Sequence, residues 1–151
     1  MHKLPVPIIA TIIGRGYSGG ALFAGGVADK LLMLQYSVFS VISPEGAAAI
    51  LLRDAELAKV AAKRMRITAQ DSLEFGIIDG IIPEPLAGAH TDFPATIKSV
   101  HKALSESLTE LSNKYEVAQN TWDLQIIADR RAKYRKMGKF TEVEPETEQT
   151  T

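Results

Sequence analysis

The chain has 151 residues, 46% of them hydrophobic, which is enough for one globular domain with a core. A formal net charge of −1 argues against nucleic acid or an anionic membrane as the main partner, and no apolar run is long enough to span a bilayer. Without cysteine there is no disulfide, thiol nucleophile or cysteine-type zinc site, and three scattered histidines do not form a helical zinc motif. We expect a cytoplasmic protein that binds no metal and has no signal peptide.

The first predicted elements are a strand, a glycine-rich turn and a short helix. Residues 6–13 form an apolar run, and four glycines occupy the seven positions 14–20, ahead of a predicted helix from residue 19 to about 27. Glycines lack the Cβ atoms that would keep a ligand from the backbone, and the first N–H groups of a helix have no partner within it. Such a turn can hold an anion or a developing oxyanion.

The central segment predicts strands at residues 30–34 and 38–42, followed by helices. Ser43 is the expected N-cap of the next helix, with Pro44 at its first position and Glu45 facing its positive end. Residues 55–65 form an amphipathic pattern, with Leu57, Val60, Ala61 and Met65 on its apolar side. Residues 68–71 form a capping signature, and residues 77–82 predict a short strand interrupted at 79–80.

Two charged helices are expected at residues 94–112 and 122–137, before a disordered tail at 141–151. The basic residues near the second helix are interpreted as a solvated face; they are Arg130, Arg131, Lys133, Arg135, Lys136 and Lys139. The expected division is a core at 1–90, a helical region at 91–139 and an acidic tail at 140–151. Because the first strand leads directly into the functional turn, we expect the domain to be incomplete at its amino terminus.

Five segments resemble, in order, the α subunit of bacterial acetyl-CoA carboxylase carboxyltransferase. They are residues 16–22 (Gly-Tyr-Ser-Gly-Gly-Ala-Leu), 33–37, 40–46 (Ser-Val-Ile-Ser-Pro-Glu-Gly), 67–70 and 81–90. The resemblance implies an α/β fold of the crotonase/ClpP type, a spiral of ββα units followed by C-terminal helices. It further implies that the chain corresponds to roughly the C-terminal half of such a subunit.

The resemblance also implies a reaction and its partners. In that family a zinc-containing β subunit pairs with the α subunit, by expectation as α2β2. The carboxyl group passes from carboxybiotin on the biotin carboxyl carrier protein, which biotin carboxylase loads, to acetyl-CoA. The product is malonyl-CoA for fatty acid biosynthesis, and no cofactor is bound covalently.

Site residues follow from the same resemblance. The backbone N–H groups of Gly19 and Gly20 are expected to form an oxyanion hole, which suits catalysis because such donors are preorganised and do not titrate. The expected substrate- and biotin-binding residues are Gly16, Tyr17, Ser18, Ser43, Pro44, Glu45 and Gly46, and no metal ligand is expected.

The sequence departs from the family pattern at three positions. Arg15 stands where glutamate is usual, and Tyr17 and Ala87 stand where glycine is usual. Tyrosine adopts a left-handed backbone at greater cost than glycine, so we expect Tyr17 to reshape the turn or narrow its mouth.

Two other functions remain open. Residues 16–20 satisfy the G-x-S-x-G pattern of serine hydrolases, with Ser18 as nucleophile, Asp71 or Asp79 as acid and His90 or His101 as base. The simpler interpretation makes Ser18 a helix-capping residue. The third function is a non-catalytic, divergent subunit that only docks on a β partner.

Overall fold

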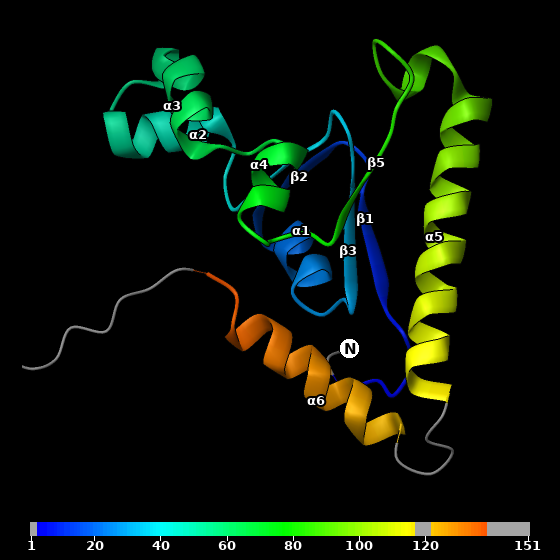
Figure 1. Ribbon diagram of the computed structural model, residues 1–151. Coiled ribbons are helices and arrows are strands. Elements are labelled where there is room, and N and C mark those ends of the chain that lie inside the picture. Colours follow the sequence, from blue (N-terminus) through cyan, green and yellow to red (C-terminus); the bar gives the residue numbers. More distant parts are fainter. Residues whose placement is uncertain (1–2, 117–121, 139–151) are drawn as a thin grey trace, which may run out of the picture.

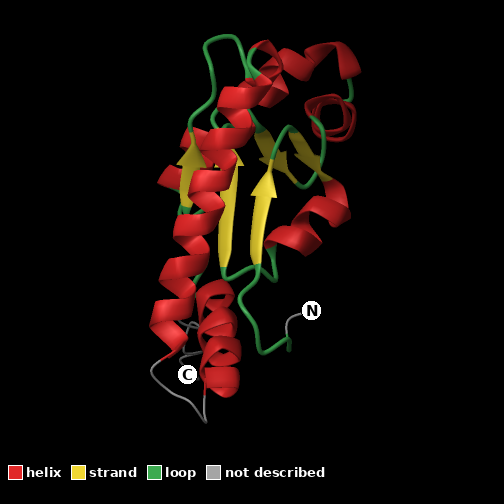
Figure 2. Ribbon diagram, turned by 90° about the vertical axis from the view of Figure 1, so that its right-hand side faces the viewer, coloured by secondary structure: helices red, strands yellow, loops and turns green. Residues whose placement is uncertain are grey.

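A three-stranded parallel sheet forms the centre of the computed structural model, which describes residues 3–116 and 122–138 (Figures 1 and 2). Its strand order is β1-β3-β5, so β3 has a neighbour on each side. The strands are β1 (Ile9–Ile12), β3 (Lys30–Leu34) and β5 (Gly80–Ile82). β3 is confirmed as predicted, whereas β1 and β5 are shorter than the apolar runs that contain them.

Helices cover both faces of this sheet, as parallel strands require. Leu31 and Met33 pack in a cluster with Ile12 on the face of α1 and α4, while Leu32 and Leu34 pack on the face of α5 (Figure 1). Consecutive side chains of a strand point to opposite faces, which explains why β3 is an unbroken apolar run. The helices are α1 (Ser18–Gly25), α4 (Ala69–Glu74) and α5 (Phe93–Glu116).

A second, two-stranded parallel sheet replaces part of the predicted glycine turn. β2 (Arg15–Tyr17) pairs with β4 (Val38–Ser40), so the expectation of an irregular turn across residues 14–20 was wrong at its centre. A Cβ atom on Gly16 would lie 3.0 Å from Ile12 and 3.2 Å from Phe39. The glycine therefore lets β2 pack against the core. The chain order β1-β2-α1 followed by β3-β4-α2 repeats one pattern.

Residues 44–65 form a small helical lobe that projects from the sheets (Figure 1). It comprises α2 (Pro44–Ala47), the π-helical segment η1 (Ala48–Leu52), the 3₁₀ turn η2 (Ala55–Leu57) and α3 (Ala58–Met65). The predicted apolar face was only partly right, because Ala61 is buried and Met65 half-buried but Leu57 and Val60 are exposed. The reason is that this lobe packs on its own alanines and not on the sheet.

The last helix, α6 (Trp122–Arg135), closes the amino ends of the strands (Figure 1). Its basic residues were predicted to be a solvated face, and for two of them this was wrong. The Arg130 side chain is 1% exposed and lies 2.7 Å from the Asp29 carboxylate, and it also donates to the carbonyl oxygens of Leu4 and Val6. Lys133 pairs with Asp79 at 2.5 Å. Helical periodicity could not reveal these carboxylates, which come from distant loops.

Thr68 and Asp71 form the predicted capping box of α4. A 3₁₀ turn, η3 (Ala89–Thr91), was not foreseen, and α5 extends beyond its expected bounds on both sides. The predicted disordered tail at 141–151 lies outside the described residues. No helix within residues 3–116 and 122–138 combines the length and apolar character needed to cross a membrane.

Candidate functional site

The register of β2 and β4 brings the two predicted site segments to one edge of the smaller sheet. Tyr17 pairs with Ser40 at the carboxyl ends of the two parallel strands. α1 begins directly after β2 and α2 begins shortly after β4, so both helices start from that edge. In open parallel sheets, ligands bind at the carboxyl ends of the strands.

The amino end of α1 is open. Gly19 and Gly20 are exposed, and a Cβ atom on either would have no atom within 4 Å. No side chain caps the helix, and its first turn holds no acidic residue. Since the first N–H groups of a helix lack acceptors within it, these groups are available to a ligand oxygen. The role of these groups as an oxyanion hole stays a prediction.

The residue with a strained backbone at the start of this helix is Ser18, the first residue of α1, and not Tyr17. Tyr17 is extended, with φ −116° and ψ 157°, so its departure from glycine causes no backbone strain. Ser18 has φ 66°, in the left-handed region. Ser18 is also not the helix cap: the N-cap residue is Tyr17, and no cap hydrogen bond forms.

The segment of residues 43–46 is held by its own hydrogen bonds and packing. The Ser43 hydroxyl accepts a hydrogen bond from the Gly46 N–H at 3.2 Å, which confirms the predicted N-cap. Pro44 occupies the first helical turn and Glu45 is exposed beside it. A Cβ atom on Gly46 would lie 2.8 Å from Ile42, so this glycine serves packing.

An apolar hollow of about 660 Å³ lies beside α1 and the end of β4. It extends from Leu22 in α1 to Met137 and Gly138, which follow α6. Its lining includes Leu22, Phe39, Val41, Phe75 and Met137.

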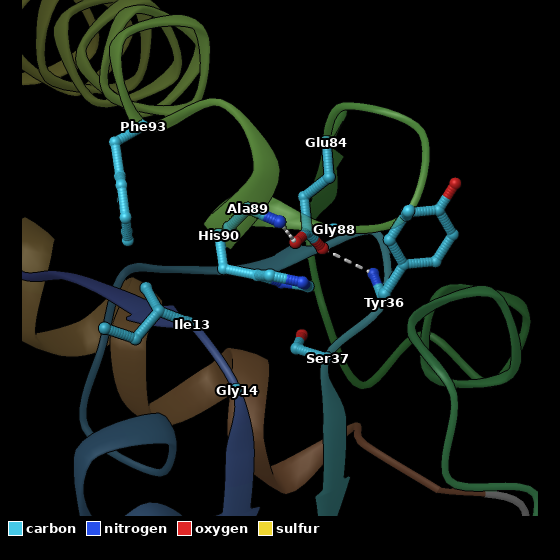
Figure 3. Close-up of a pocket in the computed structure, with 10 residues that line it drawn as sticks. Ile13, Gly14, Tyr36, Ser37, Glu84, Gly88, Ala89, His90 and Phe93 are labelled. Carbon is cyan, nitrogen blue, oxygen red and sulfur yellow. Dashed lines mark hydrogen bonds between the residues drawn. The ribbon is translucent and has the colours of Figure 1, made fainter.

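A second hollow, of about 710 Å³, lies at the carboxyl ends of β1, β3 and β5 (Figure 3). The Glu84 carboxylate shapes it by accepting hydrogen bonds from the N–H groups of Tyr36 at 2.6 Å and Ala89 at 2.9 Å. His90 and Phe93 also line it. Sequence reasoning missed the role of Glu84, although its position directly after a parallel strand was a usable signal.

The structure does not assemble a serine hydrolase triad. Asp71 bonds to Thr68 and Arg66, and the hydrogen bond from the Thr68 hydroxyl is the main cause that lowers the pKa of Asp71. Asp79 accepts from Lys133 and from the N–H of Leu31. In the part of the chain that the structure describes, the Ser18 hydroxyl bonds to neither histidine. His90 lines the second hollow, which Ser18 does not, and His101 is exposed on α5.

Of the three residues that depart from the family pattern, Ala87 is the one whose backbone conformation favours glycine. It has φ 75° in the loop beside the second hollow, a conformation that glycine adopts more cheaply. Arg15 is exposed on β2 and forms no ion pair with another described residue.

Known proteins share this fold. A malonate decarboxylase hetero-tetramer from Pseudomonas, solved in complex with coenzyme A, contains a chain that matches with a TM-score of 0.53 at 23% identity. The match covers 85% of this chain and 49% of that one. The α/β architecture with parallel sheets is consistent with a crotonase-like fold.

Comparison of sequences finds relatives with higher identity to this chain. The acetyl-coenzyme A carboxylase carboxyl transferase subunit alpha of Listeria monocytogenes is 50% identical over 140 residues, covering 93% of this chain and 42% of that protein. Its counterpart in Staphylococcus aureus is 48% identical over 145 residues, covering 94% and 43%. The chain therefore spans less than half the length of these curated relatives. Residues 1–138 match the family model for acetyl co-enzyme A carboxylase carboxyltransferase-like proteins, and the chain belongs to that family.

Proposed function

We propose that this chain supplies the α-subunit part of a carboxyltransferase site, which moves a carboxyl group from carboxybiotin to acetyl-CoA and forms malonyl-CoA. The observation that carries the proposal is the open amino end of α1, where Gly19 and Gly20 are exposed with free space around them. The names of the relatives support the same reaction.

The reaction needs stabilised oxyanions more than it needs acids or bases. The bond between the biotin ureido nitrogen and the carboxyl carbon breaks, and a new bond forms between that carbon and the methyl carbon of acetyl-CoA. The freed ureido nitrogen accepts the proton that the methyl group loses. We assign the N–H groups of Gly19 and Gly20 to the ureido oxygen, on which negative charge develops as the carboxyl group leaves.

Neighbouring features suit the remaining parts of the substrates. Tyr17 at the end of β2, Ser18 directly after it, and Ser43 to Gly46 after β4 border the same edge. The apolar hollow beside α1 suits the thiophane ring and alkyl chain of biotin. Carboxybiotin arrives on a carrier protein as a co-substrate, in the cytoplasm, and a zinc-containing β subunit completes the site in an α2β2 complex.

The finer fold is also part of this proposal. The repeated β-β-α order suits a crotonase-type spiral whose C-terminal turns occupy residues 1–90, with a helical region at 91–139. Within the described residues, β1 and β2 each lack a neighbour on one edge. Earlier turns of the spiral would cover those edges, because parallel strands are normally enclosed.

The test is carboxyl transfer from malonyl-CoA to free biotin, measured with this chain mixed with a β subunit and with a version extended to the relatives' length. Gly19→Ala and Gly20→Ala keep the backbone N–H groups but add a methyl group where the oxyanion must approach, so each should reduce kcat about 10²-fold, the scale for losing an oxyanion-hole hydrogen bond. Both should leave stability nearly unchanged, because the added methyl group meets no atom within 4 Å. Gly14→Ala is the matched control, because its added methyl group also meets no atom within 4 Å, and it should retain activity. Full activity in both glycine variants would refute the assignment.

A second candidate is a subunit that docks on a β partner without catalysis. The observations that favour it are the departures at Arg15 and Tyr17, on the strand that leads into the candidate oxyanion hole. This function predicts a stable complex with the β subunit that transfers no carboxyl group, even in the extended version. Arg15→Glu with Tyr17→Gly should then restore transfer.

A further inference from the structure

Helix α1 has few local features that would keep it helical by itself. Three of its eight residues are glycines, at positions 19, 20 and 25, and glycine loses more backbone entropy on folding than any other residue. No side chain caps its amino end, and its first residue, Ser18, has a φ of 66°. A helix this short is not stable alone in water. The position of α1 therefore depends on its contacts with the rest of the molecule.

The carboxyl end of α1 is held from two sides. On one side, Gly25 packs so closely on the core that a Cβ atom there would lie 3.1 Å from Leu31 and 3.2 Å from Phe39. On the other side, the Tyr134 hydroxyl of α6 donates to the carbonyl oxygens of Gly25 and, at 2.6 Å, of Ala28. The last carbonyl groups of a helix lack donors within it, and the Ala28 N–H reaches the Gly25 oxygen only at 3.4 Å. Tyr134 supplies the donor that this carbonyl needs.

Tyr134 is itself fixed by its neighbours on α6. One helical turn earlier, the Arg130 guanidinium lies 2.7 Å from the Asp29 carboxylate, and the two side chains are 1% and 4% exposed. Directly before Tyr134, the Lys133 ammonium lies 2.5 Å from the Asp79 carboxylate. Burial raises the pKa of Tyr134 to about 12, so its hydroxyl stays protonated and remains a donor at neutral pH. α6 therefore presents this donor at a defined place.

We propose that Tyr134 is a positioning residue for the candidate oxyanion hole, because it fixes the carboxyl end of the helix whose amino end carries Gly19 and Gly20. This inference rests on the proposed function. A helix rises about 1.5 Å per residue, which puts Gly20 roughly 7.5 Å along the helix axis from Gly25. A change in tilt at Gly25 therefore changes the direction of the N–H groups at the open amino end. Tyr134 acts through α1 and not by contact with the substrate.

The test compares Tyr134→Phe with Tyr115→Phe in the chain extended to the relatives' length. Tyr115 is the matched control, because it is a buried tyrosine whose hydroxyl bonds to Asp129 of α6, at 3.0 Å, and not to α1. In carboxyl transfer from malonyl-CoA to free biotin with a β subunit, Tyr134→Phe should lower kcat about tenfold, because small misplacements of a catalytic group are costly. The KM values of both substrates should change less than about twofold, since Tyr134 binds neither. Tyr115→Phe should keep kcat within about twofold of the unmodified chain.

Hydrogen exchange gives a second measurement that does not depend on activity. Tyr134→Phe should speed the exchange of the backbone amides of residues 22–26 by roughly fivefold or more, because the lost hydrogen bond lets α1 open locally. The amides of β3 should exchange as before. Tyr115→Phe should leave the exchange of α1 unchanged. Both variants are measured well below their thermal midpoints, so that the changes report on the folded protein.

The outcomes separate this inference from the proposed function. If Tyr134→Phe leaves either kcat or the exchange of α1 unchanged, or if Tyr115→Phe has the same effects, the inference is overturned and the proposed function stands. If the unmodified complex transfers no carboxyl group, the proposed function fails, and the catalytic part of this inference fails with it. The exchange rates then still decide whether Tyr134 holds α1.

Discussion

At the scale of single residues, the glycines of the motif have different tasks that their sequence pattern does not distinguish. Gly16 is buried between Ile12 and Phe39, whereas Gly19 and Gly20 face open space. The resemblance placed all three in one site. Only the tertiary surroundings of the absent Cβ separate a packing glycine from one that leaves the backbone open to a ligand.

Gly16→Ala should therefore destabilise the protein by about 1–3 kcal/mol, the usual cost of overpacking a core. The new methyl group would lie 3.0 Å from an Ile12 methyl carbon. Urea unfolding measures the change. Gly14→Ala, where a Cβ meets nothing within 4 Å, is the control and should lose much less. Equal losses in the two variants would contradict the packing role.

At Ala87, in contrast to Gly16, exchanging alanine and glycine should stabilise the protein when glycine is introduced. Its φ of 75° lies in the left-handed region, which costs an alanine roughly 1–2 kcal/mol relative to its preferred conformation. Ala87→Gly should raise the free energy of unfolding by about 1 kcal/mol or less, because glycine also gains entropy in the unfolded chain. Ala95→Gly in α5 should lower it instead, since glycine disfavours helix. A lower stability for Ala87→Gly would show that the loop is not strained there.

At the scale of elements, the sequence pattern predicted those helices and strands that depend on residues close together in the chain. The unbroken apolar run of β3, the Ser43 cap and the Thr68–Asp71 capping box were all readable because neighbours in sequence make them. β2 and the packing of the helical lobe at residues 44–65 could not be predicted in this way, since each depends on partners distant in sequence. α6 is the clearest case, because the basic helix that seemed solvated is anchored through the buried Arg130.

Arg130→Met should accordingly destabilise the protein strongly, by about 3–5 kcal/mol, because the Asp29 carboxylate is only 4% exposed and would lose its cation. Adding Asp29→Asn to this variant should recover part of the loss, since the amide oxygen can still accept from the Ile8 N–H. Guanidinium unfolding of the single and double variants tests this. Arg131→Met, on the exposed face, is the control. A double variant no more stable than the single one would contradict the charge argument.

At the scale of the whole molecule, the two ends of the sheet differ in character. Ion pairs and α6 close the amino ends of the strands, while the second hollow lies at their carboxyl ends and α1 begins at the carboxyl end of β2 in the smaller sheet. The Lys114–Asp129 pair, at 2.7 Å, adds a further link between α5 and α6. The hydrogen bond from Lys114 lowers the pKa of Asp129, and the same bond raises the pKa of Lys114.

Global stability should therefore fall in acid. A carboxyl group whose pKa is lowered by folding stabilises the protein above its ordinary pKa of 3.8, and this contribution is lost as pH falls below that value. For the partly exposed Lys114–Asp129 pair we expect roughly 0.2–1 kcal/mol. Urea unfolding of the wild type and Asp129→Asn at pH 7 and below pH 3 should show a larger difference at pH 7, because the contribution is lost as pH falls through the lowered pKa of Asp129. An unchanged difference between the two conditions would contradict the linkage.

The contacts of Arg130 also set an order of events during synthesis. Its guanidinium group reaches the carbonyl oxygens of Leu4 and Val6, across sequence separations of 126 and 124 residues. On the ribosome, the segment that enters β1 has left the exit tunnel long before α6 exists. The helices and β3 can pack first, but the amino end of β1 stays unsecured until residue 130 has emerged. A stalled or prematurely ended chain would expose that strand to wrong pairing, although most of its core sequence is already present.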